Sequence, residues 1–150
     1  MKSVKLYFAS IVAFAVLTVA GCGSMGGVKG ESDEVLRTRA VERWDLLIAH
    51  KADKAWDYLS PGFRETKPRE AYAAEMNNRG LHWTKATFQS QACDADTCKV
   101  RLMVNYNVDL GGPVGRVGSL SPIEETWIKV KGHWYFLPDP LEPAKLGGNS

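Results

Sequence analysis

Residues 32–50 carry apolar side chains at intervals of three and four. This spacing places them on one stripe and predicts an amphipathic α-helix. Ser32 is the expected N-cap, and Asp33 and Glu34 add favourable negative charge near the positive end of the helix. The apolar stripe consists of Leu36, Ala40, Val41, Trp44, Leu47 and Ile48.

Two shorter helices are predicted downstream. The first runs from Asp53 to Leu59 and ends there because Pro61 disfavours the helical conformation of the residue before it. The second begins after Thr66, its expected cap, and ends before Gly80, a residue type that often follows a helix.

From residue 84 onward the hydrophobic period changes from 3.6 to 2, which predicts strands. Residues 84–93 and 98–110 alternate between apolar and polar side chains, the second segment more cleanly. Residues 123–131 and 133–137 form two more strands around Lys131-Gly132, a tight-turn signal. Apolar residues share one face of the second strand: Cys98, Val100, Leu102, Val104, Tyr106, Val108 and Leu110.

Helices followed by a run of hairpin strands predict an α+β fold, with three N-terminal helices packed on a curved antiparallel sheet of about four strands. A chain of 150 residues has room for one domain, which we assign to residues 32–138. Residues 111–122 predict a loop because they are rich in Gly, Pro and Ser. Residues 139–150 predict a disordered tail.

Three segments of the domain, residues 39–44, 53–64 and 125–136, resemble the nuclear transport factor two-like superfamily. SnoaL-like proteins and ketosteroid isomerases share its cone-shaped α+β fold. The resemblance covers residues 32–138 and implies that the helices and the sheet form a cone. It also implies a homodimer through the sheet, which relatives often form. The fold hosts enzymes, binding modules and assembly subunits, so it does not select a function.

The N-terminal segment, residues 1–21, has the pattern of an export signal. Lys2 and Lys5 precede an uncharged apolar run that is shorter than the roughly 20 residues a spanning helix needs. The run ends in Val-Ala-Gly before Cys22, which resembles the lipobox of bacterial lipoproteins. The resemblance implies transfer of a diacylglyceryl group to the Cys22 thiol, cleavage before Cys22 and acylation of its new amino group, typically with palmitate. An ordinary secretory signal with a chance cysteine is the alternative.

The position of Cys22 also suggests where the mature protein is held. Acyl chains on this residue would anchor it in the lipid bilayer. Gly23 follows instead of the Asp that marks inner-membrane retention, so a Gram-negative source would place the protein in the outer membrane, facing the periplasm. Residues 22–31 are rich in glycine and predict a flexible tether.

The charge of the chain belongs to its export signal. The sequence contains 19 Lys+Arg and 17 Asp+Glu, a net charge of +2. Lys2 and Lys5 lie in the predicted signal, which contains no acidic residue, so the mature chain has no net charge. We therefore expect no nucleic-acid partner, because such proteins carry a basic surface.

Cys93 and Cys98 flank the expected turn between the first two strands. If the strands pair through this turn, the two side chains face each other at a separation that suits a disulfide. Exported proteins meet an oxidising compartment, so we predict a structural disulfide, with a metal site or a redox pair as the alternatives. Together with Cys22 this pair accounts for all three cysteines.

Isomerases of this fold use a carboxylate base inside the cone, with hydroxyl or acid donors for the oxyanion. The candidate bases here are Asp109, Glu124 and Glu125, and the candidate donors are Tyr58, Tyr72 and Tyr106. No two of them form a recognisable signature, and solvated surface charge is the simpler interpretation, so we assign no catalytic residue.

Aromatic and histidine side chains are the candidates for contacts with a ligand inside the cone, although packing is the simpler role of such residues. We assign the pocket to Trp56, Tyr58, His82, Tyr106, Trp127 and Trp134. The histidines lack ligand spacing, and the sequence contains no P-loop and no nucleophile motif. The sequence therefore predicts neither a metal nor a cofactor.

These observations predict a membrane-anchored envelope lipoprotein whose domain binds a ligand or takes part in assembly without catalysis. The expected partners are the bilayer, through acylated Cys22, and an envelope protein or a small apolar ligand. One alternative is a SnoaL-like or ketosteroid-isomerase-like enzyme acting on a small hydrophobic compound. Another is a subunit of an envelope secretion complex.

Overall fold

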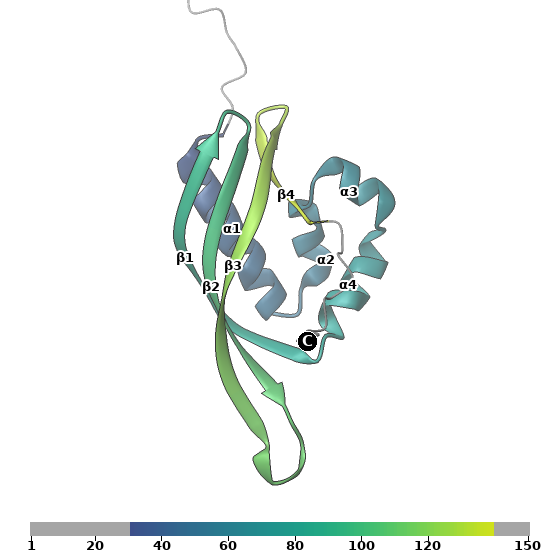
Figure 1. The fold of residues 1–150 in the computed structure, drawn as a ribbon. Helices are drawn as coiled ribbons and strands as arrows, with labels where there is room; N and C mark the ends of the chain where they lie inside the picture. Colours follow the sequence, from purple (N-terminus) through teal and green to yellow (C-terminus); the bar gives the residue numbers. More distant parts are fainter. Residues whose placement is uncertain (1–30, 140–150) are drawn as a thin grey trace, which may run out of the picture.

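The computed structural model describes residues 31–139. The predicted signal segment and Cys22 lie outside this range, as do the predicted tether before Glu31 and the predicted tail after Asp139. Within it, helices come first and strands follow (Figure 1). The elements are α1 (Asp33–Ile48), α2 (Ala52–Ala55), η1 (Trp56–Tyr58), α3 (Pro61–Thr66), α4 (Arg69–Asn77), β1 (Leu81–Asp94), β2 (Thr97–Asp109), η2 (Gly112–Val114), β3 (Arg116–Val130) and β4 (His133–Leu137).

The predicted α+β fold is confirmed, with one more helix than the sequence indicated. Pro61 ends the segment before it and also begins α3, where its fixed φ suits the first helical turn. Ser60 caps this helix by accepting a hydrogen bond from the Phe63 amide at 3.4 Å. Thr66 therefore closes α3, and the prediction that it caps the following helix is wrong, because Pro68 is the N-cap of α4.

The four strands form one antiparallel sheet in the order β1-β2-β3-β4. The loop predicted over residues 111–122 is wrong in its second half, because β3 begins at Arg116. There β3 pairs with the end of β2, and Arg116 lies opposite Asp109 with a 2.7 Å ion pair between them. The sequence did not predict this strand, because Gly118, Ser119 and Ser121 weaken the alternation of apolar and polar side chains along it.

The predicted alternation of the first strand fails at its far end. Ala86 and Phe88 are half-buried, as expected, but Ser90 and Ala92 of the same parity are exposed. Irregular pairing between Phe88 and Ser90 moves the later residues to the other face of the sheet. Such a shift leaves no signal in the hydrophobic pattern, and it bends the sheet.

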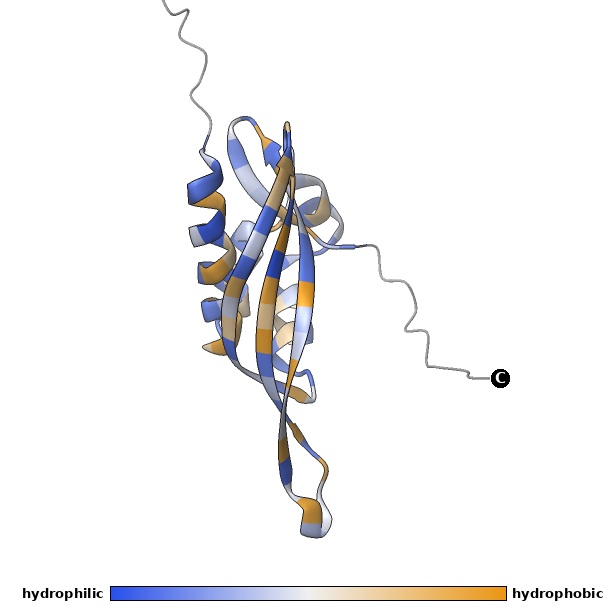
Figure 2. Ribbon diagram, turned by 60° about the vertical axis from the view of Figure 1, so that its left-hand side comes forward, coloured by the Kyte–Doolittle hydropathy of each residue, from blue (hydrophilic) through white to orange (hydrophobic). Residues whose placement is uncertain are grey.

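The core lies between the helices and one face of the sheet. Figure 2 shows α1 as a separate layer beside the strands, with hydrophobic and hydrophilic residues alternating along them. The opposite face of the sheet carries exposed charged side chains, such as Lys99, Arg101 and Glu124. Buried side chains from both layers meet: Leu36, Ala40, Trp44 and Leu47 of α1, Val100, Leu102 and Val104 of β2, Trp127 of β3 and Trp134 of β4.

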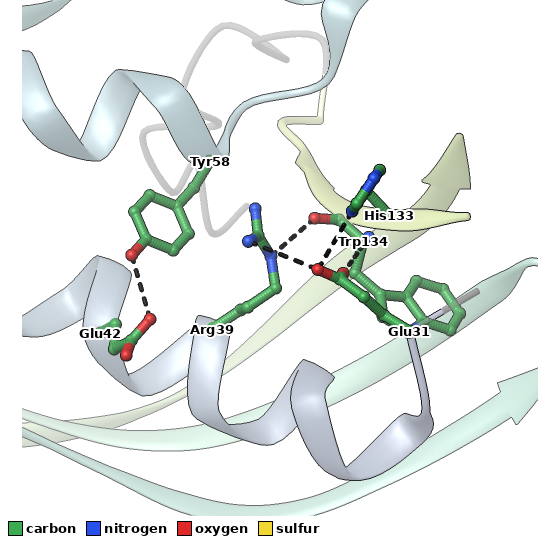
Figure 3. Close-up of polar contacts among 6 residues, drawn as sticks. All are labelled: Glu31, Arg39, Glu42, Tyr58, His133 and Trp134. Atoms are coloured by element: carbon green, nitrogen blue, oxygen red, sulfur yellow. Dashed lines mark hydrogen bonds and ion pairs between the residues drawn. The ribbon is translucent and has the colours of Figure 1, made fainter. Parts of the chain in front are cut away.

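A polar clamp fixes the first described residue to the sheet (Figure 3). Glu31 accepts a 2.7 Å hydrogen bond from the Trp134 amide and lies 3.2 Å from Nδ1 of His133. Arg39 donates from α1 to the Trp134 carbonyl at 2.9 Å. Burial acts to raise the pKa of Glu31, but the hydrogen bonds from Trp134 and His133 and the charge of Arg39 hold the pKa below its ordinary value. The clamp therefore joins the start of α1 to β4.

The hairpin of β2 and β3 projects beyond the helices, at the end of the molecule opposite the start of α1 (Figure 1). Its far part exposes apolar side chains, and Leu110, Val114 and Leu120 each keep more than half of their surface exposed. Within residues 31–139, no helix is long and apolar enough to span a membrane.

Candidate functional site

A cavity of about 500 Å³ lies between the helices and the inner face of the sheet, partly open to solvent. The volume is within the range of small-molecule binding sites. Most of its wall is apolar: Trp44 and Leu47 of α1, Phe63 of α3, Met76 of α4, Leu81 and Trp83 of β1, Ile123 of β3 and Phe136 of β4.

The polar part of the wall is built around the carboxylate of Glu125, which is 3% exposed. One oxygen accepts hydrogen bonds from Nη1 of Arg43 at 2.7 Å and from the Trp44 indole at 2.8 Å. The other oxygen accepts from the Trp127 indole at 2.9 Å. The Arg43 guanidinium also lies over the Phe136 ring, 3.9 Å from its centroid. The charges of Arg43 and Glu125 thus compensate each other inside the fold.

The donors beside this carboxylate are only partly satisfied. Tyr72, 2% exposed, accepts a long 3.4 Å hydrogen bond from Nη2 of Arg43. No described residue accepts the hydroxyl hydrogen of Tyr72, and none accepts from Nε of Arg43. Both residues line the cavity.

A second ion-pair cluster lies on the α4 side of the cavity. Glu75 pairs with Lys67 and accepts a 3.0 Å hydrogen bond from Arg79. The hydrogen bond from Lys67 is the main cause that holds the pKa of Glu75 below its ordinary value; burial opposes it, and Arg79 adds to it. Glu75 is therefore an ionised, paired carboxylate, which is a weak proton acceptor.

The three candidate bases are separated by the structure. Asp109 is exposed on the projecting hairpin, where the hydrogen bond from Arg116 holds its pKa below the ordinary value. Glu124 is exposed and binds Arg101 at 3.0 Å. Only Glu125 points a carboxylate into the fold, and both of its oxygens are already bonded.

Of the three candidate donors, Tyr72 alone lines the cavity. Tyr58 donates to Glu42 at 3.1 Å, on the opposite side of α1 from the sheet-facing stripe (Figure 3). Tyr106 lies opposite Trp83 in the register of β1 and β2.

None of the six side chains assigned to the pocket lies among the residues that line this cavity. Trp127 donates a hydrogen bond to Glu125, which lines the cavity. Trp134 is buried at the clamp. Trp56 donates to the Lys67 carbonyl at 2.8 Å, and His82 lies 3.2 Å from Asp109 on the surface. Tyr58 and Tyr106 have the positions given above.

Cys93 and Cys98 lie opposite each other at the β1–β2 turn, with their Cα atoms 4.0 Å apart and their sulfurs at disulfide distance. A carboxylate oxygen of Asp33 lies within 4.8 Å of both sulfurs. Joined sulfurs offer no thiolate to a metal ion, so this group has the chemistry of a structural crosslink.

Two residues of the site carry a signal of burial in the sequence. Arg43 lies between Ala40 and Trp44 on the apolar stripe of the first helix, where a charge must be paired when buried. Glu125 has the same parity as Trp127 and so faces the core. An acid and a base that both fall on buried faces predict a buried pair.

Comparisons with known proteins extend to the fold alone. No protein-family model and no curated protein matches the sequence. A SEC-C motif containing protein from Rhodopseudomonas palustris aligns with a TM-score of 0.52 at 15% identity, over 67% of this chain and 73% of its own. This likeness supports the α+β fold.

Two further solved structures align with lower TM-scores, and no conclusion follows from them. A SEC-C motif containing protein from Psychrobacter arcticus has a TM-score of 0.49 at 13% identity, over 83% of this chain and 66% of its own. An NTF2-like transpeptidase from Campylobacter jejuni, named for nuclear transport factor two, has a TM-score of 0.44 at 14% identity, over 73% of this chain and 100% of its own.

The buried pair gives a stability prediction. Glu125→Leu leaves the Arg43 charge uncompensated and should lower the free energy of unfolding by about 3–5 kcal/mol. Adding Arg43→Met removes that charge, so the double variant should lose less than the sum of the two single variants. Urea denaturation measures all three, and additive losses would contradict the coupling.

The matched control is the exposed pair of Arg101 on β2 and Glu124 on β3, next to Glu125. Glu124→Leu and Arg101→Met should each cost less than about 1 kcal/mol, because exposed ion pairs contribute little.

Proposed function

We propose that this protein is a lipid-anchored binding module of a bacterial envelope, which takes up a small apolar molecule in the cavity between α1, α4 and the sheet. The observation that carries the proposal is the cavity of about 500 Å³, with apolar walls and with its buried charges, Arg43 and Glu125, paired with each other. Lys67 and Glu75, which are partly exposed, also form an ion pair at its wall. Concave apolar sites with a few placed polar groups are typical of small-molecule binding.

The cavity suits binding better than the isomerase-like catalysis that the family resemblance also implies. A general base needs a carboxylate that can reach and accept a substrate proton. Glu125 is bonded to Arg43 and two indoles, and Glu75 is bonded to two cations. Enzymatic activity on a small hydrophobic compound is therefore the second candidate.

The anchor in this proposal is Cys22, nine residues before the clamp at Glu31. The tether that the sequence predicts between them would reach about 15–18 Å, so the domain would lie close to the bilayer surface. The helix α1 begins two residues after Glu31, at the end of the molecule opposite the projecting hairpin (Figure 1). The domain would therefore direct that hairpin away from the membrane, into the periplasm.

The hairpin is the feature that favours a role in assembly. Its exposed apolar residues, Leu110, Val114 and Leu120, could contact an envelope protein or a second copy of this chain. Nothing among the described residues identifies an occupant, so assembly and secretion stay predictions of the sequence.

Binding is tested with the uncharged fluorophore N-phenyl-1-naphthylamine. We expect saturable binding of one molecule per chain, with increased emission. Leu81→Trp should weaken this binding at least about tenfold, because the larger side chain occupies the cavity. Leu120→Trp, the same substitution on the hairpin, should leave binding unchanged. Equal binding by both variants and the parent protein would contradict the cavity as the site.

Anchoring is tested by labelling cells with radioactive palmitate. We expect the parent protein to carry label and to fractionate with membranes, and Cys22→Ser to lose both properties. The double variant Cys93→Ala/Cys98→Ala should keep the label, because those cysteines pair with each other. A Cys22→Ser protein that still runs at the mature size with membranes would contradict the anchor.

A further inference from the structure

A buried donor at the cavity wall points to the chemistry of the ligand. Tyr72 lines the cavity and is 2% exposed. Its hydroxyl accepts from Nη2 of Arg43 at 3.4 Å, and the hydroxyl hydrogen has no acceptor among the described residues. A buried donor without an acceptor is destabilising and rare in folded proteins, so a bound group that accepts from Tyr72 would stabilise the complex.

The charge of the site restricts which acceptor fits. The Arg43 guanidinium is compensated by Glu125 at 2.7 Å. A ligand carboxylate placed beside Arg43 would add a second negative charge next to Glu125 in a region of low dielectric, which is unfavourable. The positively charged guanidinium of Arg43 would repel a ligand cation. The arrangement therefore favours an acceptor that carries no charge.

The walls of the cavity that holds Tyr72 suit flat apolar groups. Trp44 and Trp83 pack edge to face, with ring centroids 5.4 Å apart, and both line the cavity. Phe63 and Phe136 line it as well. Aromatic walls of this kind bury ring surfaces favourably and leave specificity to the few polar contacts.

We propose that the cavity selects apolar molecules that carry one uncharged hydrogen-bond acceptor, such as the carbonyl oxygen of a ketone, an ester or an amide, and that the Tyr72 hydroxyl donates to it. The proposal rests on the proposed function, because it names the ligand chemistry of the same cavity. The neutral pair of Arg43 and Glu125 holds the oxygen of Tyr72 through Nη2 without adding a net charge.

Three naphthalenes of similar size test this selection, each competing with N-phenyl-1-naphthylamine. They are 2-acetylnaphthalene, which has a ketone, 2-ethylnaphthalene, which has no acceptor, and 2-naphthoate, which is anionic. We expect the ketone to bind about tenfold more tightly than the hydrocarbon, and the anion to bind most weakly. Tyr72→Phe should remove most of the preference for the ketone and leave the affinity for the hydrocarbon unchanged.

Tyr106→Phe is the control, because Tyr106 lies outside the cavity lining and should keep the full preference. Equal affinities for the ketone and the hydrocarbon would overturn this inference while the proposed function stands. Tightest binding of 2-naphthoate would overturn it in favour of an anionic ligand. If N-phenyl-1-naphthylamine and all three naphthalenes fail to bind, the proposed function fails as well.

Discussion

The carboxylate of Glu125 organises the interior of this domain. It lies on β3 and receives hydrogen bonds from Arg43 and Trp44 of α1 and from Trp127 of its own strand. Because both charges are buried, separating them would leave a charge without compensation, at a cost of about 3–5 kcal/mol. The pair therefore fixes where α1 lies on the sheet, and the positions of the neighbouring side chains follow from it.

The cavity is a consequence of this arrangement. Arg43 occupies the place on α1 where an apolar side chain would otherwise extend toward the sheet, and it holds Phe136 under its guanidinium. The helices α3 and α4 then close the remaining space with Phe63, Tyr72 and Met76. A site whose charges are paired in advance needs no rearrangement of its wall when a ligand binds, which favours recognition of uncharged polar groups.

The fold was more predictable from the sequence than the site. Alternation from Cys98 to Val104, broken only by Met103, placed β2, because buried and exposed faces differ along it. The bulge after Phe88 and the strand at Arg116 were missed, because pairing with β2 determines both. The site combines Arg43, Tyr72 and Glu125, which are far apart in sequence. The hydrophobic pattern can place each of them on a buried face of its helix or strand, but it cannot show that the three side chains meet.

The central claim is that Glu125 holds two indoles by hydrogen bonds beside the cavity, and hydrogen exchange of the five tryptophan indoles, followed by NMR, tests it most directly. The account predicts that the indole protons of Trp44 and Trp127 exchange slowly, because each is buried and bonded to the carboxylate. Trp83 lines the cavity, and its indole has no acceptor among the described residues, so its proton should exchange fast. Exchange of Trp44 and Trp127 as fast as that of Trp83 would contradict the account.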